Sequence, residues 1–180
     1  MQRWSPSIAG AFALLGSVAS AAAVRAEVVA AQPAGFEVVE HVHIAAPPAR
    51  VWTAVSQVGA WWSPSHTYSQ DASNLSLSLE PGSCFCERWA GGAVRHMTVV
   101  AVMPGRMVRL DGGLGPLGAL AVTGRLTIVL APAGEGTDLK LTYEVGGWAA
   151  DGLQGLAAPV DQVLGEQVQR LSRYSATGKP

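Results

Sequence analysis

The sequence contains little that could cross-link the chain or attract a polyanion. Cysteine occurs only twice in 180 residues, at Cys84 and Cys86, which excludes a fold held together by several disulfides. Twelve basic residues stand against 13 acidic ones and form no cluster, so the electrostatic footprint of a nucleic-acid-binding protein is missing. The sequence also lacks the motifs of phosphate-binding loops and of serine nucleophile elbows. Small molecules and other proteins therefore remain as partners, and we expect no nucleic acid.

Long apolar runs are also scarce. The only candidate, Ile8–Val18, is shorter than the ~20 residues that a membrane-spanning helix needs. It follows Arg3 and precedes the small-residue stretch Ala19–Ala26, which is the layout of a secretory signal peptide. We therefore predict a cleaved signal peptide over residues 1–26 and a periplasmic or secreted protein without a stable membrane anchor.

Two alternatives concern this N-terminal segment: cleavage after Ala22 or Ala23, and no cleavage at all, which would leave an anchor. Removal of residues 1–26 takes away two basic residues and no acidic ones, so the net charge becomes −3. The segment 27–35 resembles a short leader. The remainder of the chain is long enough for one domain, which we place at residues 36–175, with a tail at 176–180.

The two cysteines are separated by one residue in a predicted strand. Cα atoms two residues apart in a regular strand are roughly 6.5 to 7 Å apart, at the edge of what a disulfide spans. We therefore expect no relaxed internal disulfide between Cys84 and Cys86. The pair could instead be two buried apolar side chains, a redox pair, half of a metal site, or the source of an intermolecular bridge.

Most of the domain has the period-two pattern of half-buried strands, interrupted by glycine and proline turns. A first strand, 36–44, leads through Pro47 and Pro48 into a helix that runs to about Gln57. A loop to about residue 73 comes next, and then further strands near residues 75–80, 83–89, 93–103, 106–110, 122–130 and 138–145. This order predicts an α+β fold with a curved antiparallel sheet.

The stretch Asp151–Tyr174 has the apolar rhythm of an amphipathic helix. Such a helix would cover the apolar face of the sheet and leave a cavity where small ligands bind. Leu156 and Val160 are on its apolar face and are candidates for the cavity wall. Pro159 either kinks the helix or marks the start of its long part after one short turn.

The chain resembles the START / polyketide-cyclase / birch-pollen-allergen (SRPBCC) superfamily, and within it the branch named after the activator of the heat-shock chaperone ATPase. The resemblance covers Phe36 to about Tyr174 and depends on the order of several short motifs. These are Ala45-Ala46-Pro47-Pro48-Ala49-Arg50-Val51-Trp52, Trp61-Trp62, Pro81-Gly82, His96–Val100, Pro104-Gly105, Gly112–Leu117 and Gly136-Thr137.

The resemblance implies a helix-grip fold with a deep, mainly apolar cavity under the C-terminal helix. Members bind lipids, sterols, polyketides and other hydrophobic molecules, and a minority catalyse cyclisation, dehydration or hydrolysis. The chaperone-related role of the branch's namesake is not expected here, because an exported protein would not meet a cytosolic partner.

Glu40 is the most informative single residue, because it is a carboxylate on the apolar face of the first strand. It could lie in water at the cavity mouth, pair with Arg88, Arg95 or His96, or contact a ligand. A carboxylate inside a cavity could orient a ligand hydroxyl or act as a general base with a raised pKa.

Glu87 and His96 are on neighbouring predicted strands and could form a pair that polarises the imidazole. Such a pair is also a common structural contact. Tyr143 is on the inward face of the last strand, where its hydroxyl could bind a ligand or a backbone group. Trp62 and Phe85 complete the predicted ligand-binding set.

No compact metal-binding spacing is present, so we predict neither a metal site nor a cofactor. The expected function is binding of a small hydrophobic molecule rather than catalysis. The alternative is a cyclase- or dehydratase-like enzyme that uses Glu40, or Glu87 with His96, as acid–base groups. A third hypothesis is an interaction protein with a filled core. The sequence does not indicate the oligomeric state.

Overall fold

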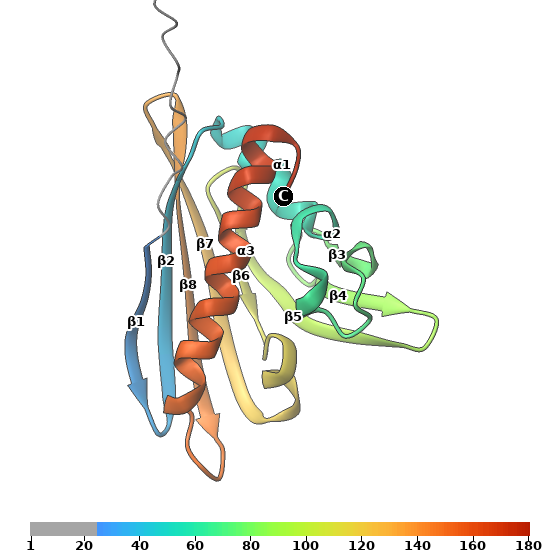
Figure 1. Ribbon diagram of the computed structural model, residues 1–180, viewed down its shortest axis with the longest axis vertical. Helices are drawn as coiled ribbons and strands as arrows, with labels where there is room; N and C mark the ends of the chain where they lie inside the picture. Colours follow the sequence, from blue (N-terminus) through green and yellow to red (C-terminus); the bar gives the residue numbers. More distant parts are fainter. Residues whose placement is uncertain (1–24) are drawn as a thin grey trace, which may run out of the picture.

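A curved antiparallel sheet grips a long C-terminal helix in the computed structural model, which describes residues 25–180 (Figure 1). The eight strands are ordered β1-β2-β8-β7-β6-β5-β4-β3. Strands β3 to β8 form a meander of sequential neighbours, and β2 joins β1 to this meander by pairing with both β1 and β8. The predicted α+β helix-grip fold is confirmed.

Each element has defined bounds. The strands are β1 (Arg25–Gln32), β2 (Gly35–Ile44), β3 (Leu75–Leu77), β4 (Cys84–Trp89), β5 (Gly92–Met103), β6 (Met107–Asp111), β7 (Ala121–Ala133) and β8 (Gly136–Trp148). The helices are α1 (Pro48–Ser56), α2 (Val58–Trp61) and α3 (Ala157–Thr177), with short 3₁₀ turns η1 (Pro64–His66), η2 (Ala72–Asn74), η3 (Gly115–Ala119) and η4 (Gln154–Leu156).

Alternation along β7 and β8 builds the floor of the core. Leu126 is paired with Tyr143, and Ile128 with Leu141, so that four apolar side chains lie on the same face. All four are buried, whereas Thr127 and Thr142, the residues between them, are only half-buried. Because side chains alternate across a strand, this pattern places one apolar face toward α3.

Helix α3 covers that face. Leu164, Val168 and Leu171 recur at steps of four and three and are buried against the sheet. Pro159 is the third residue of the helix, in the first turn, where a missing N–H breaks no intrahelical bond. Of the two expectations for this proline, a start after one short turn is therefore correct, and the short turn is η4.

Side chains of α3 also hold the segment that comes after α2. Gln167 accepts a hydrogen bond from the backbone N–H of Ser63 at 2.8 Å. The guanidinium of Arg170 donates to the carbonyl of Trp61 at 2.6 Å. These bonds fix the segment 61–63 against the helix.

The N-terminal segment differs from the sequence prediction. The segment 27–35, expected to be a leader, forms most of β1 and the turn into β2, because its backbone pairs with β2 through a bulge between Val28 and Ala30. The domain thus begins before residue 36. The predicted signal peptide lies outside the described residues except for its last two, which start β1. Within residues 25–180, no helix has the length and apolarity to cross a membrane.

The expectation for the cysteines is also wrong, because the structure joins Cys84 and Cys86 by a disulfide. The expectation assumed a regular strand. The pairing of β4 with β5 instead shifts register between Phe85 and Cys86, and the two Cα atoms are only 5.4 Å apart. This separation lies within the range that a disulfide spans.

Candidate functional site

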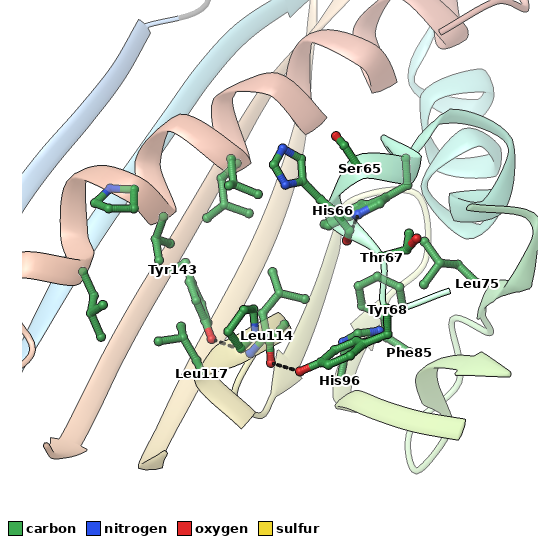
Figure 2. A pocket seen from close by; sticks show the side chains of 18 residues that line it. Ser65, His66, Thr67, Tyr68, Leu75, Phe85, His96, Leu114, Leu117 and Tyr143 are labelled. Carbon is green, nitrogen blue, oxygen red and sulfur yellow. Dashed lines mark hydrogen bonds between the residues drawn. The ribbon is translucent and has the colours of Figure 1, made fainter. Parts of the chain in front are cut away.

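The candidate site is a cavity of about 410 Å³ between the sheet and α3. Figure 2 shows the side chains that surround it. One wall comes from the start of α3 and the turn before it, with Leu156, Pro159, Val160, Val163 and Leu164 in the lining. Spacings of three and four residues put these side chains on one face of the helix.

Aromatic side chains form a second wall. The rings of Trp62 and Phe85 meet edge to face with centroids 5.5 Å apart, and both line the cavity. Phe85 in turn contacts the imidazole of His96 at a centroid distance of 5.2 Å. The indole N–H of Trp62 donates to the carbonyl of His66 at 3.1 Å, which fixes the ring.

The loop that contains Leu114 lies between two tyrosines, Tyr143 and Tyr68. Figure 2 draws the hydrogen bond between Leu114 and Tyr143 and the one between Tyr68 and Gly115. The Tyr143 hydroxyl accepts a bond from the backbone N–H of Leu114 at 2.9 Å and donates to the carbonyl of Gly112 at 3.1 Å. From the other side, the Tyr68 hydroxyl donates to the carbonyl of Gly115 at 3.2 Å. The loop is thus clamped on both sides.

Tyr143 is held close to the sheet by a glycine. A Cβ atom at Gly124 would lie 2.5 Å from the phenol ring, so only glycine lets the ring cross β7 at this point. Burial raises the pKa of Tyr143 to about 12, although the bond from Leu114 opposes this. The hydroxyl is therefore neutral and fully engaged with the backbone, which is the second of the two roles expected for it.

Glu87 and His96 form the predicted pair, with His96 Nε2 3.3 Å from a carboxylate oxygen. His96 lines the cavity, whereas Glu87 lies behind it and is fully buried. The Glu87 carboxylate also accepts hydrogen bonds from the backbone N–H groups of Ser69 at 2.6 Å and Tyr68 at 3.1 Å. These bonds hold both partners in place.

The pair consists of a carboxylate and a neutral imidazole. Burial acts to raise the pKa of Glu87, but the hydrogen bonds from Ser69, Tyr68 and His96 outweigh it and place the pKa below its ordinary value. Burial lowers the pKa of His96, although the carboxylate opposes this. The Nδ1 atom of His96 is buried and has no hydrogen-bond partner.

Glu40 is on the apolar face, as predicted, but it is not part of the cavity lining. Its carboxyl group lies beneath α3 at Gly165, and neither oxygen has a hydrogen-bond partner. Burial, and then the nearby Asp161, raise the pKa of Glu40 to about 8. Pairing with an arginine or with His96 is absent because three strands, β8, β7 and β6, separate β2 from β5.

Six of the eight predicted ligand-binding residues thus line one cavity: Trp62, Phe85, His96, Tyr143, Leu156 and Val160. Glu87 contacts the site through His96, and Glu40 is elsewhere. Sequence reasoning missed Tyr68, because no periodicity describes the loop that brings it opposite Gly115. In the described part of the chain, no three His, Cys, Asp or Glu side chains are grouped so that they could hold a metal ion.

Several solved structures share this fold. The TM-score is 0.56 to protein MLL2253 from Mesorhizobium loti, at 19% identity, covering 76% of this chain and 94% of that one. It is 0.57 to the Aha1 dimer from Colwellia psychrerythraea, at 18% identity, with coverage of 80% and 98%. It is 0.56 to DynU16, from the dynemicin biosynthetic locus, at 24% identity, with coverage of 80% and 48%. At such identities the likeness is one of fold alone.

Comparison with curated proteins found no significant match. The sequence itself, however, matches a family described as "Polyketide cyclase / dehydrase and lipid transport" over residues 35–176. The match spans β2 through nearly all of α3 and includes every residue that lines the cavity. Because it covers well over half of the chain, this protein belongs to the polyketide cyclase/dehydrase and lipid transport family.

Proposed function

We propose that this protein binds a small hydrophobic molecule in the cavity between the sheet and α3. The observation that carries the proposal is the cavity itself, whose volume of about 410 Å³ is enclosed mainly by leucine, valine, proline and aromatic side chains. Small-molecule sites have volumes of roughly 300–1,000 Å³ and predominantly apolar walls. The family description, which includes lipid transport, supports the same function.

The neutral fluorophore N-phenyl-1-naphthylamine tests this proposal. Val160 lines the cavity, so Val160→Trp places a large ring where the ligand would lie. We expect the variant to weaken probe binding roughly tenfold or more, because a filled site cannot also hold a ligand. The change in probe fluorescence on titration with protein measures this.

Gln162→Trp is the matched control, because Gln162 is exposed on the same helix and does not line the cavity. It should bind the probe like the wild type. Equal affinity of Val160→Trp and the wild type, with both proteins folded, would show that the probe binds elsewhere and would contradict the proposal.

A second candidate function is catalysis of the cyclase or dehydratase type, which the Glu87–His96 pair favours. A neutral imidazole with a free Nδ1 can take a proton from a bound substrate, and Glu87 would stabilise the imidazolium that forms. In a dehydration, His96 would then return the proton to the departing oxygen, which leaves as water. Glu40 has no part in this site, and the Tyr143 hydroxyl is already engaged.

The two functions differ in what becomes of the ligand. Native mass spectrometry of protein purified from its own envelope would identify a bound molecule, which is then incubated with fresh protein and analysed by liquid chromatography. Recovery of the unchanged molecule supports binding alone. Time-dependent loss of water, abolished in His96→Phe, would support the enzyme.

We also propose that the protein acts after export, because residues 1–26 have the layout of a secretory signal. Cells producing the full chain with a C-terminal tag would be fractionated, and the mass of the tagged protein measured. We expect a shortened chain in the periplasm or medium. A full-length chain confined to the cytosol would contradict export without affecting the binding proposal.

A further inference from the structure

His96 Nδ1 stands out among the polar side-chain atoms around the cavity because it alone is buried there without a partner. The other polar side chains in the lining all bond within the protein. The two tyrosines bond to the loop at Gly112–Gly115, and the Trp62 indole N–H donates to the His66 carbonyl. The remaining pairs are Ser65 with Ser63, His66 with Glu166, and Thr67 with the Pro64 carbonyl.

The surroundings of Glu87 fix which hydrogen-bonding role this atom has. The carboxylate accepts from two backbone N–H groups, those of Tyr68 and Ser69, which can only donate. It therefore acts as an acceptor toward His96 as well, and the imidazole proton is on Nε2. In a neutral imidazole the other nitrogen, Nδ1, is then an acceptor with no proton of its own.

We propose that the ligand is a neutral, hydroxylated hydrophobic molecule whose O–H group donates a hydrogen bond to His96 Nδ1. This inference rests on the proposed function and adds the ligand's chemical class. A buried acceptor without a partner is unfavourable, and a ligand hydroxyl would satisfy it. The flanking rings of Tyr68 and Phe85, with centroids 5.9 and 5.2 Å from the imidazole, suit a flat apolar body beside the hydroxyl.

The same geometry disfavours other polar ligands. A ketone or ether has no proton to donate to Nδ1. An ionised carboxylate also lacks a proton, and it would have to enter an apolar cavity close to the buried negative charge of Glu87. The site therefore selects a donor over an acceptor of the same shape.

Three probes of matched shape test this selection: 2-naphthol, 2-methoxynaphthalene and 2-naphthoate. Isothermal titration calorimetry with the full domain measures each affinity near neutral pH. We expect 2-naphthol to bind about tenfold more tightly than 2-methoxynaphthalene, in line with one hydrogen bond to a buried group, and 2-naphthoate to bind most weakly. In His96→Phe the first two should bind alike.

A second measurement uses the unaltered protein and so does not depend on the folding of the variant. The ¹⁵N signal of His96 Nδ1 should shift when 2-naphthol is added and should not shift with 2-methoxynaphthalene. Equal binding of all three probes, or an unchanged Nδ1 signal in the 2-naphthol complex, would overturn this inference and leave the proposed function standing. Binding of none of the probes would overturn both.

Discussion

Two buried titratable residues, Glu40 and His96, have different environments although both face the concave side of the sheet. His96 has a carboxylate behind it and the cavity in front, whereas Glu40 has α3 above it and no hydrogen-bond partner. A buried carboxyl group without a partner favours its neutral form. Glu40 is therefore protonated at neutral pH, since its pKa is raised to about 8 by burial and by Asp161.

This raised pKa predicts how stability depends on pH. An unfolded chain releases the Glu40 proton near the ordinary value of 4.5, whereas the folded protein releases it near 8. The folded state thus binds one more proton between these values, and this stabilisation is lost as pH rises from 4.5 through 8. The loss of stability is caused by ionisation of Glu40. Replacing Glu40 with a residue that cannot ionise should therefore prevent the loss.

We expect Glu40→Gln to exceed the wild type by about 4 kcal/mol in the free energy of unfolding at about pH 9, and to show no such gain at about pH 5. Urea denaturation across this pH range measures the difference. Glu135→Gln makes the same chemical change in the exposed β7–β8 turn and should behave like the wild type. Parallel pH profiles for Glu40→Gln and the wild type would contradict the assignment.

The Tyr143 hydroxyl has a structural role that a substitution can isolate. Tyr143→Phe leaves the Leu114 N–H and the Gly112 carbonyl without their partner, at a cost of about 1–3 kcal/mol in stability. Amide hydrogen exchange at Leu114 should become faster. Tyr174→Phe, which removes an exposed bond to Gln57, should leave that rate unchanged. Unaltered exchange at Leu114 in Tyr143→Phe would rule out the clamp.

At the scale of elements, a bulge shifts the register between β4 and β5, and its extra residue is His96 on β5. At this register shift the Cα atoms of Cys84 and Cys86 are 5.4 Å apart, and both Phe85 and His96 line the cavity. Helix α3 has a comparable local adjustment at its start, where Pro159 occupies the first turn and still lines the cavity. Both adjustments position apolar side chains without interrupting the element.

The disulfide should contribute modestly to stability, because it closes only a very short loop in the unfolded chain. We expect the double variant Cys84→Ser/Cys86→Ser to lose about 1–2 kcal/mol. Denaturation with and without dithiothreitol measures this: the wild type should lose the same amount when reduced, and the variant should not respond. A reductant-insensitive wild type would count against the disulfide.

At the scale of the whole molecule, the two sides of α3 have different roles. On one side the helix packs against β1 and β2 and buries Glu40 beneath Gly165. On the other side it faces the aromatic wall that Trp62 and Phe85 form, and the cavity lies between them. Figure 1 shows β1 at the edge of the sheet next to β2. β1 is therefore the edge strand on the side of the molecule where α3 packs directly against the sheet.

This arrangement predicts different effects of two truncations. A chain beginning at Glu27 keeps most of β1, whereas one beginning at Gly35 exposes the edge of β2 and the flank of α3. We expect the shorter chain to lose about 3 kcal/mol, or roughly 6–12 °C in Tm, and to self-associate through its open edge. Thermal melts and size-exclusion chromatography compare the two; identical behaviour would show that β1 is dispensable.

The sequence alone determined the class of fold, because side-chain alternation at period two and recurrence at steps of three and four are local properties of the chain. The faces of β7, β8 and α3 could be predicted from these patterns, and so could the proximity of Glu87 and His96, since a short hairpin makes their strands neighbours. The cavity residues on α3, Leu156 and Val160, were predicted for the same reason.

Only the tertiary structure decided what depends on distant segments. Separation of Glu40 from His96 results from the strand order, which places three strands between them. His96 Nδ1 is the one buried polar side-chain atom around the cavity without a hydrogen-bond partner. This follows from the tertiary structure, because the hydroxyl groups of Tyr68 and Tyr143 bond to the loop between them. Periodicity fixes which face of an element a side chain occupies, whereas contacts across the fold fix which neighbour it meets there.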